Sequence, residues 1–440
     1  MSNPQTNLDE VIAPAPILTS PEKPSDHQDY LDNRNANEDR EGHPIPEEEE
    51  HVPRDQVSNV QSGHHASDTW RTVYIVSHLT FFSFLGTLLR IAVECLTFYP
   101  GAPIATSVLW ANVGGSMVMG FLSEDKNLFL SKKPDPKKTD EEGNSALQRV
   151  EAQDPPKKTI PLYIGLTTGF CGSFTSFSTF IRDIFLATIN SLPVPLGQYP
   201  AISLFSSPPA TARAPSGGFS FMAILAVLFT EIGLSLIGLF LGAHLAIGVS
   251  PWTPSLPRKF LSILNPLMVI LAILSWVAVI CLVILLPDYG QDSTIWGAEL
   301  WRGPVLFSLV FSPLGCLARF FLSLKLNARI ASFPLGTFVA NVAGTMVLGM
   351  AYSLQHASIS VSTYGGGSII GCQVLQGIMD GFCGCLTTVS TWVLELSSLR
   401  RRHAYTYGAI SVVVAYCALV MEIGSLKWSI GLTTPVCFAE

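Results

Sequence analysis

Two copies of a dodecapeptide rich in glycine and hydroxyl side chains lie within long apolar runs of the chain. The first, "GFCGSFTSFSTF", covers residues 169–180, and the second, "GFCGCLTTVSTW", covers residues 381–392. Consecutive Thr, Ser and Gly residues weaken a membrane helix, so each copy predicts a helix break. Irregular backbone at that depth is tolerated only where it is buried in protein or lines water. Freed carbonyls at such a break can bind a cation, and hydroxyl groups can replace the water around an anion.

The side chains of the two copies are candidates for an ion pathway. The shared hydroxyl residues are Thr175, Ser176, Ser178 and Thr179 in the first copy and Thr387, Thr388, Ser390 and Thr391 in the second. The first copy also places Phe177 and Phe180 on one helix face, where their electropositive ring edges could face an anion. Ordinary packing is the commoner role of two phenylalanines, and only the neighbouring hydroxyls favour a pathway. The second copy has Val389 and Trp392 at these positions.

Two asparagines and two arginines are repeated in the same way. The segments "WANVGGSMVMG" and "VANVAGTMVLG", 229 residues apart, contain Asn112 and Asn341. An amide facing lipid would be costly, so each asparagine either joins helices or lines a pathway. The segments "GTLLR" and "GCLAR" place Arg90 and Arg319 four residues after a glycine. Each arginine faces a partner or a wet cavity, or extends toward the membrane surface.

The composition is that of a polytopic membrane protein. Of the 440 residues, 48% are hydrophobic and 13% are charged, which is far from a soluble domain. The net charge of −7 arises in residues 1–70, which hold fifteen acids against four Lys and Arg. This segment has no apolar periodicity and is predicted to be a disordered, acidic cytoplasmic tail without a cleaved signal peptide. The nine cysteines are predicted to be free thiols.

Nine apolar runs are long enough to cross a bilayer. They cover residues 73–97, 103–123, 160–190, 218–248, 259–287, 304–324, 334–354, 369–398 and 404–426. The repeated motifs divide eight of these runs into two four-span halves, and run 259–287 has no counterpart. The predicted organisation is therefore a tail (1–70), a first repeat (71–250), a linker transmembrane helix (251–300) and a second repeat (301–440).

The basic residues orient these spans. Lysines of loop 124–159 place that loop and the N-terminus in the cytoplasm by the positive-inside rule. The other basic clusters then also fall inside: Arg258 and Lys259, Lys325 and Arg329, and Arg400 to Arg402. The unpaired span reverses the second half, so the repeats are predicted to be inverted, with an extracellular C-terminus. In such an arrangement the two broken third helices cross at the centre of the membrane.

The motifs GxxxR, ANVxG and GFCGxxT[TS]xST, in this order in each half, resemble those of the Fluc-type fluoride channels. Two inverted copies joined by an extra helix resemble the eukaryotic fluoride exporters of that family, over about residues 70–430. The resemblance implies a passive, fluoride-selective anion channel in the plasma membrane that exports fluoride and protects against its toxicity. It implies no enzyme activity and no nucleic-acid partner. A single chain containing both repeats would act as a monomer in the lipid bilayer.

The resemblance also implies roles for individual residues. Asn112 and Asn341 would donate hydrogen bonds to fluoride, and Phe177 and Phe180 would flank the ion. The remaining pathway residues would be Ser178, Thr179, Thr388, Ser390, Thr391, and the tyrosine–serine pair Tyr407 and Ser411. The backbone carbonyls of Gly172, Thr175, Gly384 and Thr387 would hold a structural Na⁺, and Arg90 and Arg319 would be structural charges. The fourth span has no tyrosine–serine pair that can be placed by sequence.

The second copy departs from the family pattern at Val389 and Trp392, and the first departs at Ser176, where the family has threonine. In single-domain relatives, two identical subunits build two equivalent pathways. A fused chain is free to let one of them diverge. At most one pathway is therefore predicted to be fully equipped.

The main alternative is a proton-coupled small-molecule secondary transporter of the inverted-repeat type. Such a transporter needs a central carboxylate that titrates, and Glu231 is the mid-span candidate, without a counterpart in the second half. A scaffold whose repeats only pack together would not require the hydroxyls beside two phenylalanines. The chain has no GxxxxGK[ST] motif, so nothing indicates an ATP-driven pump.

Overall fold

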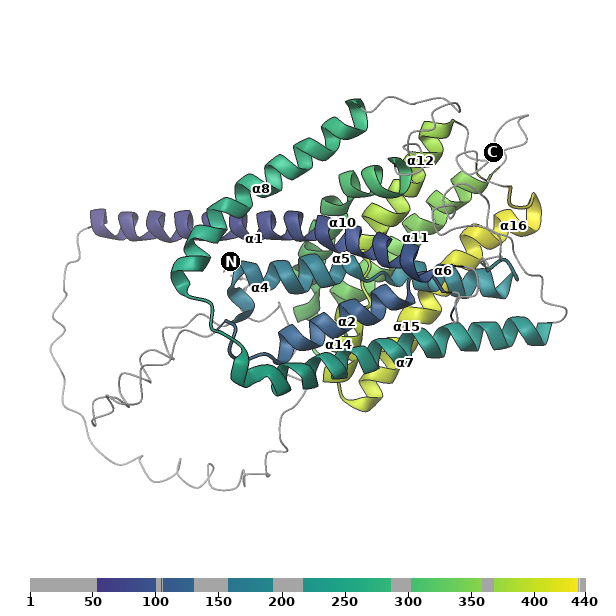
Figure 1. Cartoon of the computed structure of the whole chain (residues 1–440), viewed down its shortest axis with the longest axis horizontal. Coiled ribbons are helices and arrows are strands. Elements are labelled where there is room, and N and C mark those ends of the chain that lie inside the picture. The colour runs from purple at the N-terminus through teal and green to yellow at the C-terminus, as the bar shows by residue number, and fades with distance from the viewer. Residues whose placement is uncertain are drawn as a thin grey trace, which may run out of the picture.

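The computed structural model describes residues 54–99, 104, 106–129, 157–192, 217–285, 302–357, 368–433 and 435. Within these ranges every regular element is a helix (Figure 1). Many of these helices turn apolar surface outward. Large hydrophobic side chains are exposed along the helices at residues 217–249 and 258–285, as expected for contact with lipid. The predicted class, an all-helical polytopic membrane protein, is confirmed.

The first half contains four helical segments, of which the third is interrupted. The first two are α1 (Arg54–Thr97) and α2 (Leu109–Glu124). The third, interrupted segment consists of η3 (Lys157–Thr159), α4 (Pro161–Ile164), η4 (Gly165–Cys171), α5 (Gly172–Phe174) and α6 (Phe177–Thr188). The fourth is α7 (Gly217–Val249) with η6 (Ser250–Trp252). Helix α8 (Arg258–Leu285) follows and extends away from the other helices at one end (Figure 1).

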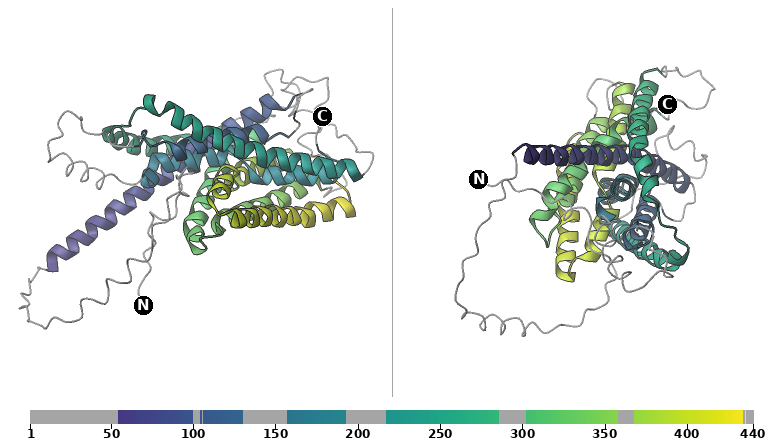
Figure 2. Two further views of the ribbon diagram at one scale, coloured as in Figure 1. Left: turned by 90° about the horizontal axis from the view of Figure 1, so that it is seen from below. Right: turned by 90° about the vertical axis from the view of Figure 1, so that its left-hand side faces the viewer.

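The second half repeats this order. Its elements are η7 (Arg302–Phe307), α10 (Ser308–Leu326), η8 (Asn327–Arg329) and α11 (Leu335–His356), then the interrupted run α12 (Ile369–Gly377), η9 (Ile378–Cys383), α13 (Gly384–Leu386) and α14 (Ser390–Ser398), and finally α15 (Arg401–Leu419), η10 (Val420–Gly424) and α16 (Ser425–Ser429). The helices of the two halves form two adjoining groups, purple to teal and green to yellow (Figure 2).

Seven helices of the described residues are long and apolar enough to cross a membrane. The other two predicted spans coincide with α2 and with the α4–α6 run. Helix α2 has 16 residues, which at 1.5 Å per residue is shorter than the hydrocarbon core, and the α4–α6 run is interrupted after Phe174. Each of the nine predicted runs thus contains helix within the described residues, but nine crossings and the inverted orientation of the halves stay predictions.

Two expectations from the sequence need correction. Helix α1 begins at Arg54, so residues 54–70, assigned to the disordered tail, continue the first span as a helix; the rest of the tail lies outside the described residues. A polar segment joined to a formed helix needs no new nucleus, because elongation adds one hydrogen bond per residue fixed. The expectation of free cysteines is wrong at Cys372, which is disulfide-bonded.

Equivalent glycines make equivalent contacts in the two halves. A β-carbon at Gly86 would lie against the carbonyl of Phe170, and one at Gly315 against the carbonyl of Phe382. Gly115 packs on Thr175 in the same way that Gly344 packs on Thr387. Small residues allow such close approach of membrane helices. These matched contacts support the two predicted repeats, since they pair the residues that the sequence motifs align.

Helices α2 and α7 pack at backbone distance. A β-carbon at Gly120 would overlap the carbonyl of Leu239, and one at Gly242 would overlap the carbonyl of Met117. The far end of α2 is held by Lys157, whose Nζ donates to the carbonyl of Asp125 at 2.9 Å and to two further carbonyls of that turn. A cation at a helix C-terminus is favourable. Burial lowers the pKa of Lys157, and the nearby acids Asp125 and Glu124 oppose this shift.

Candidate functional site

Both dodecapeptides contain the predicted helix break. Helix α5 ends at Phe174, Thr175 is extended with ψ 149°, and α6 begins at Phe177. In the second copy α13 ends at Leu386 and Thr387 is extended with ψ 153°, and α14 begins at Ser390. Because the broken segments are buried in protein, their backbone groups avoid lipid.

The two repeated asparagines hold the breaks open. Asn112 Oδ1 accepts the N–H of Ser176 at 2.8 Å, and Asn341 Oδ1 accepts the N–H of Thr388 at 2.8 Å. In a continuous α-helix, these N–H groups would bond to the carbonyls four residues earlier, those of Gly172 and Gly384. Each asparagine therefore replaces a helical hydrogen bond and releases one glycine carbonyl.

Two hydroxyl groups release the other carbonyls in the same manner. The N–H of Thr179 donates to Ser176 Oγ at 3.3 Å, and that of Thr391 donates to Thr388 Oγ1 at 3.5 Å. The helical acceptors of these N–H groups would be the carbonyls of Thr175 and Thr387. The four carbonyls that the resemblance assigns to a sodium ion are thus among those that the breaks release. Carbonyl oxygens suit a hard cation, so these residues fit the ion.

The breaks of the two halves cap one another. Thr387 Oγ1 accepts the N–H of Ser178 at 3.1 Å and lies 3.0 Å from Ser178 Oγ. Reciprocally, Thr175 Oγ1 accepts the N–H groups of Val389 and Ser390, each at 3.2 Å. The first N–H groups of a helix have no intrahelical partner, so each threonine satisfies the start of the other half's helix. The two breaks are therefore in direct contact, as predicted.

Each of the two repeated arginines donates a hydrogen bond to a backbone carbonyl of the other half. Arg90 donates from Nε to the carbonyl of Ser173 at 3.2 Å and from Nη2 to the carbonyl of Asp380, and its guanidinium lies against Gly384. Arg319 donates to the carbonyl of Thr168 at 2.6 Å and lies against Gly172. Their exposed fractions are 0% and 2%, so extension toward the membrane surface is excluded. Both arginines join the halves and place positive charge beside the carbonyl ends of short helices.

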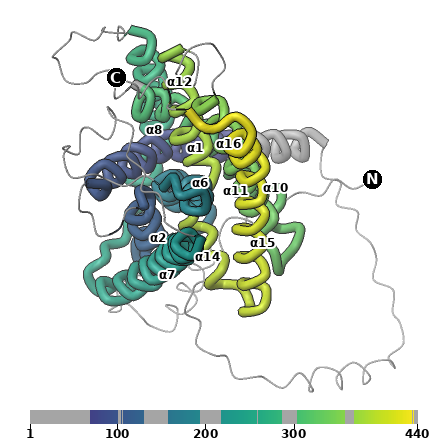
Figure 3. Tube along the Cα trace, turned by 90° about the vertical axis from the view of Figure 1, so that its right-hand side faces the viewer, coloured from purple at the N-terminus to yellow at the C-terminus, as the bar shows by residue number. Residues whose placement is uncertain are grey.

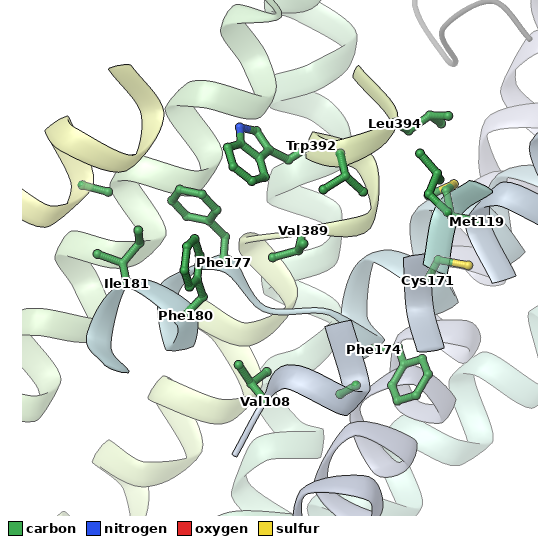
Figure 4. Close-up of a cluster of buried hydrophobic side chains, with 14 of the residues drawn as sticks. Val108, Met119, Cys171, Phe174, Phe177, Phe180, Ile181, Val389, Trp392 and Leu394 are labelled. Atoms are coloured by element: carbon green, nitrogen blue, oxygen red, sulfur yellow. The ribbon is translucent and has the colours of Figure 1, made fainter. Parts of the chain in front are cut away.

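Three aromatic residues of the two copies, Phe177, Phe180 and Trp392, form one buried cluster (Figure 4). The Phe177 ring is 5.3 Å from the Trp392 ring and 5.7 Å from the Phe180 ring, both with edge-to-face geometry. Val389 lies in the same cluster and offers no ring. The aromatic pair that spans the two halves is therefore Phe177 with Trp392.

Tyr407 and Ser411 are both fully buried on α15. The Tyr407 hydroxyl donates to Glu395 Oε2 at 2.7 Å, and Thr337 donates to Glu395 Oε1 at 2.6 Å. Ser411 donates to the carbonyl of Tyr407 at 2.7 Å. Sequence reasoning did not identify Thr337. Its only signal was its place one turn before Asn341 on the same helix face.

The remaining candidates lie on two sides of the breaks. Helix α6 packs against α7, α11 and α15, and α14 packs against α2, α7 and α15; α6 lies near the middle of the bundle (Figure 3). We call the surface that α11 and α15 turn toward the breaks, with Asn341, Tyr407 and Ser411, the Asn341 side. The surface contributed by α2 and α7, with Asn112 and Glu231, is the Asn112 side. All the predicted pathway residues are buried except Thr391, which is half-buried.

On the Asn112 side, a contact appears that the sequence did not indicate. Asn112 Nδ2 donates to Glu231 Oε2 at 2.9 Å. On α6, the neighbouring residues Arg182 and Asp183 form an ion pair at 3.1 Å. The Asn112–Glu231 contact could be found only with the rotation of each helix known, because neither spacing nor a repeated motif links these two residues.

This fold and this centre define a class of protein. A polytopic membrane protein with two interlocked helix breaks, buried amides and rows of hydroxyls has the features of an ion-conducting membrane protein and not of a soluble enzyme. The sequence profile described as "CrcB-like protein, Camphor Resistance (CrcB)" matches residues 78–243 and 306–423, one stretch in each half. The chain belongs to the CrcB family.

Named relatives cover most of the chain. It is 46% identical over 416 residues to "Fluoride export protein 1" of Neurospora crassa, which covers 90% of this chain and 76% of that protein. It is 34% identical to "Fluoride export protein 1" of Candida albicans over 79% of this chain and 78% of the relative. "Fluoride-specific ion channel FluC" of Pseudomonas aeruginosa is 36% identical over 138 residues, 30% of this chain and 99% of the relative. No solved structure matches the chain.

Proposed function

We propose that the protein is a passive fluoride channel that exports fluoride from the cytoplasm and protects the cell from its toxicity. The observation that carries this proposal is the buried centre of interlocked breaks, in a chain whose relatives are named fluoride exporters over most of its length. Fluoride binds water tightly, so its passage requires several donors that replace the hydration shell together. The buried centre brings together an amide group, several hydroxyl groups and two aromatic ring edges that could serve this purpose.

The Asn341 side is the pathway that we propose for fluoride. The N–H of Thr388 donates to Asn341 Oδ1 and so orients the amide. The second amide N–H of Asn341 would contact the dehydrated ion, and Ser411 would line the same pathway. Phe177 and Phe180 would present ring edges to it, and the hydroxyls of Ser178, Thr179, Thr388, Ser390 and Thr391 would complete the polar surface. Hydrogen fluoride enters a cell uncharged and dissociates in the more neutral cytosol. An inside-negative potential then drives the anion outward, at about 2.3 kcal/mol per charge per 100 mV.

The site of action that we propose is the plasma membrane, with one chain supplying both repeats and thus the whole pathway. The lysines of loop 124–159 favour a cytoplasmic N-terminus. Nine crossings would then place the C-terminus outside. The mutual capping by Thr175 and Thr387 supports a monomer, because each half already completes the other.

A sodium ion bound by the carbonyls of Gly172, Thr175, Gly384 and Thr387 is a further part of this proposal. It would neutralise the partial negative charge of two converging helix C-termini and so hold the breaks together. The buried guanidinium groups of Arg90 and Arg319 lie against Gly384 and Gly172 of the same segments.

Removing Na⁺ should lower the melting temperature of the detergent-solubilised protein. A ligand at about 100 times its dissociation constant stabilises the folded state by about 2.7 kcal/mol, and this is lost when N-methyl-D-glucamine chloride replaces NaCl at equal ionic strength. The measurement is tryptophan fluorescence during heating, with NaCl added back as the control. An unchanged melting temperature in the two salts contradicts the sodium site.

Fluoride efflux from proteoliposomes tests the function itself. Vesicles loaded with fluoride and containing the purified protein should release it to a fluoride electrode when valinomycin balances the charge, and protein-free vesicles should not. Equal passage of chloride would contradict the proposed substrate. A requirement for a proton gradient would favour the proton-coupled transporter, for which the buried Glu231 is the relevant carboxylate.

A further inference from the structure

The carboxyl group of Glu231 is buried in the middle of helix α7. Its exposed fraction is 1%, and Oε1 is buried without a hydrogen-bond partner. In the part of the chain that the structure describes, no basic side chain forms an ion pair with it. The two charged side chains close enough to influence it electrostatically, Asp183 and Glu94, are also acids. The hydrogen bond donated by Asn112 is therefore the polar contact that fixes the position of this carboxyl group.

The two asparagines consequently differ in what they can offer an anion. Asn112 donates one amide N–H to Glu231 at 2.9 Å and directs the other toward the carbonyl of Ser176 at 3.5 Å. Asn341 donates one N–H to the carbonyl of Thr388 at 3.2 Å. Its second N–H has no partner among the described residues. An amide nitrogen carries two donors, so Asn341 keeps one available while the stronger donor contact of Asn112 is taken.

Helix packing identifies the helix that corresponds to α7 in the other half. Gly120 lies against the backbone of Leu239 on α7, and its repeat partner Gly349 lies against the side chains of Leu419, at the end of α15, and of Glu422, which follows it. The carboxyl group of Glu231 thus stands on the helix that corresponds to α15, which carries Tyr407 and Ser411 on the Asn341 side.

We propose that the Glu231 carboxyl group is a built-in acceptor that occupies the donor of Asn112 and closes the Asn112 side to fluoride. This inference rests on the proposed fluoride function. A tethered acceptor competes at a high effective concentration, and the amide N–H that it accepts is withheld from a passing anion. Conduction is then confined to the Asn341 side, and the residue that confines it is Glu231.

The test uses full-length protein in which the Asn341 side is disabled by Asn341→Asp. Fluoride efflux from proteoliposomes should be lost in this background and should rise about tenfold when Glu231→Ser is added. Serine keeps a small polar group on α7 and removes the carboxyl group. Because Val389 supplies no ring on this side, the regained efflux should stay below that of the original protein. Glu422→Ser in the same background is the matched control, since Glu422 of η10 carries the same carboxyl group and makes no hydrogen bond to either asparagine.

Each result is decisive. Efflux that survives Asn341→Asp alone overturns the inference, because a side that still contains Glu231 would then conduct. The inference also fails if Glu231→Ser restores nothing in monodisperse protein, or if Glu422→Ser restores as much. Should Glu231→Ser not yield folded protein, Glu231→Ala must give the same regain. Absence of fluoride efflux from the unaltered protein would instead reject the proposed function.

Discussion

Replacing Asn341 with aspartate should lower fluoride efflux by at least about 100-fold. Aspartate keeps the oxygen that accepts the Thr388 N–H at 2.8 Å, so the helix break survives, but it removes both amide donors and adds a negative charge. Two like charges 4 Å apart repel by about 4 kcal/mol at an effective dielectric constant of 20, which is more than two factors of ten in rate. The measurement is initial efflux from proteoliposomes of matched protein content.

Folding of this variant needs to be measured alongside its flux. A melting temperature close to that of the original protein is expected, because the bond that holds the break is retained. Fluoride efflux at the original rate, from protein shown to be incorporated, would remove Asn341 from the pathway. The assignment of the conducting side would then be wrong.

The sequence predicted the centre of the molecule better than its periphery. Both breaks follow from the local chemistry of "FTSFS" and "LTTVS", because hydroxyl groups three residues apart compete with the helical acceptors, as Ser176 and Thr388 do. The contact between the breaks follows from the repeat, since an inverted pair brings equivalent segments together at midplane. Local composition and symmetry were enough for these features.

Contacts that depend on helix rotation could not be predicted. Asn112 and Glu231 are 119 residues apart and meet because α2 and α7 pack at one particular angle, fixed by glycines. The hydrogen bond from Arg90 to the carbonyl of Asp380 likewise depends on how helices of the two halves pack together. A residue-by-residue transfer from the resemblance assigned both asparagines the same role, whereas among the described residues only Asn112 donates to a buried carboxyl group, that of Glu231. The two halves thus differ at Glu231 on α7 as well as at Val389 and Trp392.

Valine at Gly242 should prevent the first half from assembling. A β-carbon there would overlap the backbone carbonyl of Met117 on α2, and backbone cannot move aside as the end of a side chain can. Overpacking of this kind costs about 3 kcal/mol, a large part of the stability of a typical domain, so little monodisperse protein should be recovered after solubilisation. Gly233→Val is the matched control, because it makes the same change on the same helix where a β-carbon meets nothing within 4 Å. Equal yields of the two variants by size-exclusion chromatography would contradict the close packing of α2 on α7. The position of Glu231 against Asn112 depends on that packing, so such a result would also remove the basis for a closed Asn112 side.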